Sequence, residues 1–421
     1  MPSERFTGLA AVLDAIRGDD SVTQPVLVDR VGLGRSVLAQ RVAELEAAGL
    51  VEYHGRGPST GGRAPRTLRL RGEAGYVLGV DIATNELLVA VADLAGNLLE
   101  TRHESTDVSY GPEAIFTIVE RMADALLDHT GARGNLWTVG IGMPGPVAHD
   151  ADGTTTMPNM PDWNRFPTRA RLEARWGAPV WMDNRVNLSA LGERRVNPLA
   201  AASRQTVYLG GGEEIGAAVV VDGRIYRGAR GLAGEIAHVP VPEAGEVVCP
   251  CGHRGCRDAV AGRAALVLDG RLLAEIGQST ALAEVLARTG VIRPVDVTEA
   301  ADKGDPAAQA LLHRSAHRLG SSLATLVNVF NPDLVILGGG MARASAHLLE
   351  AIREAIHRRA LPAATRDLRI EPSAVDMEIA GMIGAVQFAV DEIFTPDRLS
   401  RWLDSRTPAG RLVVDRLADS A

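Results

Sequence analysis

All three cysteines of this chain lie within eight residues of one another. Cys249, Cys251 and Cys256 follow His238 and enclose His253. Thiolates and an imidazole at this spacing are typical of a four-coordinate structural zinc site. Three buried free thiols are the alternative, since cysteine also behaves as a small apolar residue. Such close clustering in a chain of 421 residues favours zinc. From spacing alone, either His238 or His253 could be the fourth ligand.

The overall composition limits the class of protein. A chain of this length has room for roughly two or three domains with substantial cores. No apolar run reaches the length of a membrane span, and the first residues lack the apolar segment of a signal peptide. Few cysteines, clustered as metal ligands, fit a reducing cytoplasm. The net charge of -8 argues against nucleic-acid binding over the whole surface. We expect a cytoplasmic protein with no membrane partner.

The N-terminal part has the element order of a winged helix-turn-helix. Apolar spacing predicts helices over residues 5–17 and 36–48, with a second helix between them that Thr23 could cap. A strand should begin at Leu50, after the third helix. A three-helix adaptor that binds no DNA is the alternative. Residues 53–71 contain five arginines and no carboxylate, and this favours DNA binding.

We expect the third helix to enter the major groove and the following glycine-rich wing to follow a minor groove. Glycines permit the backbone to approach the DNA closely there, and the negative potential of the minor groove attracts guanidinium groups. A solvated linker is the alternative for this wing. The candidate DNA contacts are Arg35, Ser36, Gln40 and Arg41 from the helix, and Arg56, Arg63 and Arg66 from the wing. We assign residues 1–72 to the DNA-binding domain.

From Tyr76 onward the chain alternates between strands and helices. The apolar runs 77–81 and 87–93 predict paired strands of a buried sheet. Further strands are expected over residues 138–143 and 179–182, and helices over residues 112–129, 168–176 and 188–195. This alternation predicts an α/β fold.

Two motifs resemble those of the ROK family, which comprises repressors, open reading frames and sugar kinases. Glu235-Ile236-Ala237-His238 followed by the cysteine cluster resembles the family's zinc motif, with Ala237 in place of a glycine. The N-terminal domain and Gly61-Gly62-Arg63-Ala64-Pro65 resemble its repressor branch. The resemblance implies a two-lobed actin-like ATPase (ribonuclease H-like) fold over residues 73–395. It implies one structural zinc bound by His238, Cys249, Cys251 and Cys256. The C-terminal tail 396–421 has no counterpart.

The kinase motifs of the family are altered in three places. Its phosphate hairpin, Asp-x-Gly-x-Thr, corresponds here to Asp81, Ala83 and Asn85. Its second phosphate loop, Gly-Thr-Gly, corresponds to Gly212-Glu213-Glu214. Its catalytic aspartate is replaced by Arg185, which stays protonated and has no acceptor, so it cannot be a general base. The resemblance therefore implies a kinase-like cleft that has lost catalysis.

The sugar side of the cleft is better preserved. The candidate ligand-binding residues are Asn159, Asn184, Arg185, Glu235, His238 and Asp258. Of these, Asn184, Glu235, His238 and Asp258 match positions that bind sugar hydroxyls in the family, with Asp258 in place of a longer glutamate. Arg185 among them would favour an anionic ligand such as a sugar phosphate or acid. Alternatively, Arg185 pairs with Glu235 or Asp258 and seals the cleft.

These features together predict a DNA-binding transcriptional regulator and not an enzyme. We expect a repressor of sugar or secondary metabolism that senses a sugar or sugar derivative. It should bind an inverted-repeat operator as a homodimer or homotetramer. One alternative is an active ATP-dependent sugar kinase that carries a DNA-binding domain, and position 185 distinguishes the two. Another is a regulator that responds to a partner protein or metabolic state.

Overall fold

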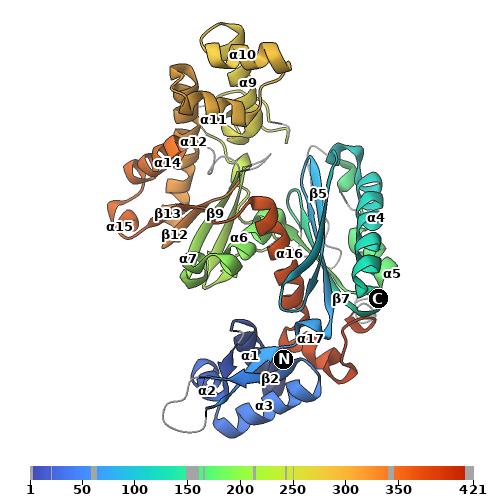
Figure 1. Ribbon diagram of the computed structural model, residues 1–421. Helices are drawn as coiled ribbons and strands as arrows, with labels where there is room; N and C mark the ends of the chain where they lie inside the picture. The colour runs from blue at the N-terminus through green and yellow to red at the C-terminus, as the bar shows by residue number, and fades with distance from the viewer. Residues whose placement is uncertain are drawn as a thin grey trace.

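The computed structural model describes residues 3–19, 21–57, 64–147, 161–164, 166–211, 215–241, 244–249, 251–339 and 346–412. An N-terminal domain is followed by two lobes that each contain a β-sheet (Figure 1). Among the described residues, no helix combines the length and the apolar character needed to cross a membrane.

The N-terminal domain packs three helices on a small sheet with strand order β1-β3-β2. The buried side chains of the third helix, Leu38, Val42 and Leu45, recur every three or four residues and give it one apolar face. Gly32, in the left-handed region at φ 72°, ends the second helix. The elements are α1 (Glu4–Arg17), β1 (Val22–Thr23), α2 (Gln24–Val31), α3 (Arg35–Ala47), β2 (Val51–Arg56) and β3 (Arg66–Leu70). This is the winged helix-turn-helix order that the sequence predicts.

Lobe 1 is built on a five-stranded sheet of order β6-β5-β4-β7-β8. The strand β4 pairs antiparallel with β5 and parallel with β7, which makes the sheet mixed. Helix α4 contacts β5 and β6 and helix α5 contacts β8, while α16 packs on β4, β7 and β8. The elements are β4 (Tyr76–Ile82), β5 (Glu86–Asp93), β6 (Leu98–Ser105), α4 (Pro112–Thr130), β7 (Leu136–Met143), α5 (Thr168–Trp176), β8 (Val180–Asn184) and α16 (Met377–Ile393).

Lobe 2 has a second five-stranded sheet of order β11-β10-β9-β12-β13. The strands are β9 (Gln205–Gly211), β10 (Ile215–Val221), β11 (Arg224–Ile225), β12 (Leu334–Leu337) and β13 (Arg369–Pro372). The helices are α6 (Arg185–Val196), α7 (Pro198–Ala202), α8 (Asp258–Ala261), α9 (Arg263–Glu275), α10 (Thr280–Thr289), α11 (Pro294–Asp302), α12 (Pro306–Phe330), α14 (Ala346–Arg359) and α15 (Pro362–Thr365). The α/β class expected from the sequence is therefore confirmed.

The two lobes meet where α6 crosses α16 (Figure 1). Helix α6 packs on β9 and β10 of lobe 2, whereas α16 packs on the sheet of lobe 1. Two glycines allow the helices to approach closely. A Cβ added at Gly384 would lie 1.8 Å from the Leu188 carbonyl oxygen, and one added at Gly192 would lie 1.8 Å from that of Ala380. Backbone therefore packs on backbone at the junction of the lobes.

Helix α6 begins three residues earlier than the apolar pattern predicts. The side chain of Asn184 accepts a hydrogen bond from the Val186 amide at 2.7 Å, which is an N-cap interaction. The helix therefore includes residues 185–187, which were expected to form a loop. Arg185 is its first residue, so the helical backbone fixes the position of Arg185.

The C-terminal segment, for which the sequence offered no interpretation, is ordered against the N-terminal domain. It forms α17 (Pro396–Trp402) and a 3₁₀ turn (Leu403–Ser405), and α17 contacts α1 (Figure 1). Trp402 is completely buried. Residues 413–421 lie outside the described part of the chain.

Candidate metal centre, ligand cleft and DNA-binding surface

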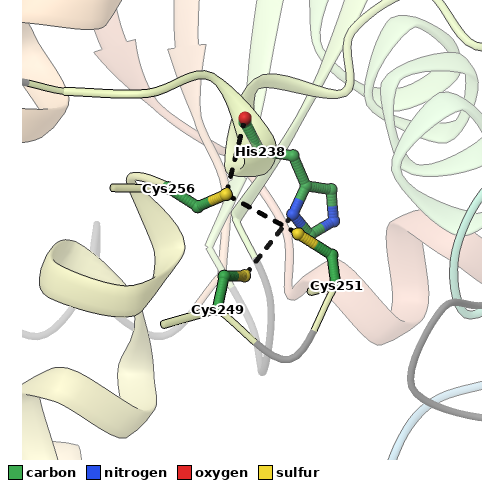
Figure 2. Close-up of side chains that lie close together, drawn as sticks. All are labelled: His238, Cys249, Cys251 and Cys256. Atoms are coloured by element: carbon green, nitrogen blue, oxygen red, sulfur yellow. Dashed lines mark hydrogen bonds between the residues drawn. The ribbon is translucent and has the colours of Figure 1, made fainter. Parts of the chain in front are cut away.

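The predicted metal ligands come together in space. His238, Cys249, Cys251 and Cys256 each place a donor atom within 4.8 Å of the other three (Figure 2). The Cys249 sulfur lies 3.7 Å from His238 Nδ1, and the Cys251 and Cys256 sulfurs lie 3.6 Å apart. Tetrahedral donors about 2.3 Å from zinc would lie about 3.8 Å from one another. The cluster thus fits a metal ion in both chemistry and spacing.

The backbone around the cluster explains how so short a segment presents three thiols. Gly252 and Gly255 have φ values of 89° and 78°, in the left-handed region. The Cys249 amide donates to the His253 carbonyl at 2.8 Å and closes the tight turn. The His253 ring lies 3.6 Å from the Cys251 sulfur but is exposed and outside the four-donor cluster. The geometry therefore favours His238 over His253 as the fourth ligand.

The candidate ligand cleft lies between the lobes, one loop away from the metal cluster. Asn184 and Glu235 both line it, and the Asn184 amide donates to Glu235 at 3.3 Å. Its enclosed space among the described residues is about 50 Å³, whereas ligand pockets usually span about 300–1,000 Å³. In this conformation the described cleft is therefore narrower than a usual ligand pocket.

Two other predicted ligand-binding residues, His238 and Asp258, are not among the described residues that line the cleft. His238 directs Nδ1 toward the Cys249 sulfur (Figure 2). Asp258 accepts a hydrogen bond from the Ile215 amide at 3.3 Å, and burial raises the pKa of its carboxyl. Asn159 lies outside the described residues.

Arg185 pairs with Asp81 and not with Glu235 or Asp258, so the alternative in which either of those two carboxylates seals the cleft is wrong. Its Nη2 lies 2.8 Å from Asp81 Oδ2 and its Nε lies 3.2 Å from Oδ1, in a two-pronged contact. Burial opposes the charge of Arg185, but Asp81 outweighs burial and raises the pKa of the guanidinium. Asp81 is only 1% exposed and Arg185 12% exposed. The arginine is thus neutralised by the first residue of the altered phosphate hairpin.

Two glutamates add negative charge beside this pair. Glu378 lies in the first turn of α16, and Glu86 begins β5 directly after the hairpin. Burial raises the pKa of Glu378, and the neighbouring carboxylates of Glu86 and Asp81 raise it further. Three carboxyl groups around one guanidinium make this end of the cleft unfavourable for a nucleotide's phosphates.

The raised pKa of Glu378 predicts that removing its charge increases the stability of the fold, by an amount that depends on pH. A carboxyl group with a raised pKa in the folded state stabilises the fold at low pH, and that contribution is lost as pH rises through the folded-state pKa. Glu378→Gln should therefore unfold at higher denaturant than the parent protein at pH 8, with little difference near pH 4.5. Exposed Glu284→Gln is the matched control. An equal effect of Glu378→Gln at both pH values would contradict this account.

One inter-lobe ion pair was not anticipated from the sequence. Arg227, in the loop after β11, lies 2.7 Å from the buried carboxylate of Asp183 at the end of β8. The partners are 44 residues apart, so no local pattern could have indicated the contact. It joins lobe 2 to lobe 1 beside the cleft.

The predicted DNA contacts of α3 divide into two groups. Arg35, Ser36 and Gln40 are exposed. Arg41 was expected to be exposed as well, but its side chain is only 13% exposed and lies 2.5 Å from Glu44. Arg41 thus packs against α1 instead of facing outward. Gly8 of α1 lies against its side chain, and Arg5 of α1 forms an ion pair with the same Glu44 that Arg41 contacts.

The described part of the wing, outside residues 58–63, carries cationic side chains that pair with no described carboxylate. Arg56 and Arg66 are exposed and directly opposite each other on β2 and β3. Among the described residues no carboxylate pairs with either, whereas Arg69 pairs with Glu52 nearer the domain core. Arg66 stacks on Tyr53, with its guanidinium 4.0 Å from the ring centre. Two like charges that lie directly opposite each other on paired strands destabilise the pairing when no opposite charge accompanies them. Arg63 lies outside the described residues.

A two-lobed α/β domain with this cysteine cluster defines a known class, and the ROK family model matches residues 77–392. The chain belongs to the ROK family. A xylose repressor of Caldicellulosiruptor bescii is 26% identical over 389 residues, covering 91% of this chain and 95% of the relative. A glucokinase of Halalkalibacterium halodurans is 32% identical over 316 residues, covering 73% of this chain and 93% of the relative.

The fold also has a counterpart among solved structures. The crystal structure of a ROK family transcriptional regulator, described as a homologue of the E. coli MLC protein, superposes with a TM-score of 0.78. It is 22% identical and covers 95% of this chain and 99% of its own. At this identity the similarity establishes the fold, including the arrangement of two lobes after an N-terminal domain.

Proposed function

We propose that this protein is a DNA-binding transcriptional repressor that responds to a sugar in its inter-lobe cleft. The observation that carries the proposal is the exposed Arg56–Arg66 surface, which pairs with no described carboxylate, on the wing of a helix-turn-helix domain joined to a ROK domain. Guanidinium groups that lack acidic partners are suited to phosphate oxygens. The full-length similarity to a xylose repressor supports the same assignment. Such a repressor works in the cytoplasm, where the chromosome lies.

The cleft favours a neutral sugar over an anionic one. Asp81 already engages Arg185 through both hydrogen bonds, so the cation that could attract a phosphate or carboxylate is neutralised. Asn184 and Glu235 line the cleft with an amide and a carboxylate, which are groups suited to vicinal hydroxyls. A pentose such as xylose is the first candidate, since relatives over nearly the whole chain are xylose repressors.

In this proposal the cleft has no kinase activity. A catalytic carboxylate would accept the sugar proton, whereas Arg185 has no acceptor. The pairing of Arg185 with Asp81 also occupies the hairpin that would approach phosphates. Glu213 and Glu214 add two further charges at the second phosphate loop; they lie outside the described residues.

The proposal is tested by selecting bound sequences from random duplexes with the purified full-length chain. We expect an inverted repeat whose half-sites are roughly 10–10.5 bp apart, or a multiple of that, so that both recognition helices meet one face of the duplex. Affinity for the selected repeat should fall steeply with salt, and xylose should weaken it. A chain that selects no sequence, and binds DNA no better at low salt, is not a DNA-binding repressor.

Substitutions on α3 and on the wing should act differently. Gln40→Ala removes an exposed amide suited to an adenine edge, and should weaken binding to the selected repeat by about 1–3 kcal/mol while sparing random DNA. Arg56→Ala, Arg63→Ala and Arg66→Ala should weaken binding to all sequences and each reduce the salt slope by about one.

Arg41→Ala is the matched comparison for Gln40→Ala. Because Arg41 pairs with Glu44 inside the domain, its loss should lower the melting temperature of the protein and leave base preference unchanged. Competition titrations over several salt concentrations check both outcomes. A changed base preference for Arg41→Ala, with none for Gln40→Ala, would contradict this assignment of the helix faces.

A further inference from the structure

We infer that α16 and the C-terminal helix α17 hold the DNA-binding domain on lobe 1, with the Arg17–Asp391 ion pair as the positioning contact. The inference rests on the proposed function, because it concerns how ligand in the cleft would reach the DNA-binding domain. It assigns a role to the C-terminal segment that follows the family domain, which ends at residue 392.

The joint begins with a contact between the first and last parts of the chain. Arg17, at the end of α1, places Nη2 2.8 Å from Asp391 Oδ1 in the last turn of α16. The Arg17 side chain is only 9% exposed. Its guanidinium also lies 5.5 Å from the centre of the Phe394 ring. An arginine held by a carboxylate and an aromatic ring has a defined direction, so it orients α1 relative to α16.

Aromatic packing by α17 completes the joint. The Trp402 ring lies 5.4 Å from Trp137 of lobe 1 and 5.9 Å from Phe394, and its indole N–H donates to the Ile393 carbonyl at 2.9 Å. Arg398 lies 4.1 Å from the Trp181 ring. One hydrophobic core therefore continues from α1 through α17 into lobe 1. The DNA-binding domain is packed on lobe 1 instead of being suspended from a flexible linker.

The other end of α16 forms part of the ligand cleft. Met377 lines the cleft, and a Cβ added at Gly381 would lie 3.1 Å from the carboxylate of Asp81, which holds Arg185. From Gly381 to Asp391 the helix rises about 15 Å, at about 1.5 Å per residue. A single helix thus links the cleft to the Arg17 contact, and Figure 1 shows α16 running from between the lobes toward α17.

This arrangement makes the DNA-binding domain follow lobe 1 when the cleft opens or closes. The lobes contact each other through α6 and α16, where Gly192 and Gly384 let the backbones touch. Rotation at this crossing would carry α16, α17 and the DNA-binding domain together, relative to lobe 2. In an oligomer, cleft closure would then change the separation of two recognition helices.

The test uses charge reversals in the full-length protein and needs no sugar. Binding is measured to duplexes in which the two halves of the selected repeat are separated by a spacer that increases one base pair at a time. The parent protein should prefer one spacing sharply. Arg17→Asp or Asp391→Arg places like charges together, and each should flatten this preference by up to about fivefold, since partly exposed ion pairs have modest energies. Affinity for a single half-site should stay unchanged.

The double variant with both reversals restores opposite charges and should recover the spacing preference. This recovery separates positioning from a general loss of stability. Arg121→Ala, which breaks an exposed ion pair with Glu104 on lobe 1, is the control and should leave the profile intact. An unchanged profile in both single reversals overturns the inference while leaving the repressor function standing. Failure of the parent protein to bind the repeat at all counts against the proposed function itself.

Discussion

Cys256→Ser should release the metal and unfold the segment around the cleft-side cluster. Cys256 is almost fully buried, and its sulfur lies 3.6 Å from that of Cys251. Zinc binding contributes about 10–16 kcal/mol in zinc-finger peptides, which is as large as the net stability of a typical domain, about 5–15 kcal/mol. We expect about one zinc per chain in the parent protein by elemental analysis, none in the variant, and a markedly lower melting temperature.

The two histidines provide a matched pair of variants for this prediction. His238→Asn should lose zinc because Nδ1 faces the cluster, whereas His253→Asn should keep it because that ring lies outside the four donors. Sugar binding should fail together with zinc, since Glu235 is three residues from His238 and lines the cleft. Absence of zinc from freshly purified, reduced parent protein would rule out the metal site.

The parts of the fold that the sequence could predict are those governed by local patterns. Apolar spacing located α3 and α5 to within one residue. Cysteine spacing predicted the metal cluster because its three thiols lie in one short turn. The choice between His238 and His253 needed coordinates, since both bring Nδ1 close to a cysteine sulfur and only His238 belongs to the four-donor cluster.

Contacts between distant segments could not be predicted. Arg185 and Asp81 are separated by 104 residues, and several carboxylates were equally plausible partners for the arginine. Arg41 has the spacing of an outward-facing residue, but α1 supplies Gly8 and Arg5 around it. Likewise, the sequence offered no interpretation of residues 396–412, because the contact of Trp402 with Trp137 joins segments that are far apart in the chain.

The purified protein should release no ADP from Mg-ATP in the presence of glucose, mannose, N-acetylglucosamine, N-acetylmannosamine or xylose. Loss of a general base alone typically removes about 10²–10⁴ in rate, which a sensitive assay could still detect. The phosphate end of the cleft adds a second defect, which is weak nucleotide binding. Asp81 is paired with Arg185 there, and the carboxyl groups of Glu86 and Glu378 lie beside this pair. Turnover and nucleotide affinity should therefore be lost together. A family glucokinase assayed in parallel is the positive control, and calorimetric titration of Mg-ATP measures the affinity.

Arg185→Asp should not restore activity, although it recreates the catalytic residue type of the kinases. The substitution removes the cation from Asp81, which is 1% exposed, and breaking a buried pair in this way costs about 3–5 kcal/mol. We expect a less stable and still inactive protein, whereas Arg185→Lys should keep most of the stability by retaining the charge. Activity would require the hairpin at Ala83 and Asn85 and the loop at Glu213 and Glu214 to be rebuilt as well. Sugar-dependent ADP release by the parent protein, abolished by Glu235→Ala, would show instead that Arg185 is compatible with catalysis and that the cleft is an active kinase site.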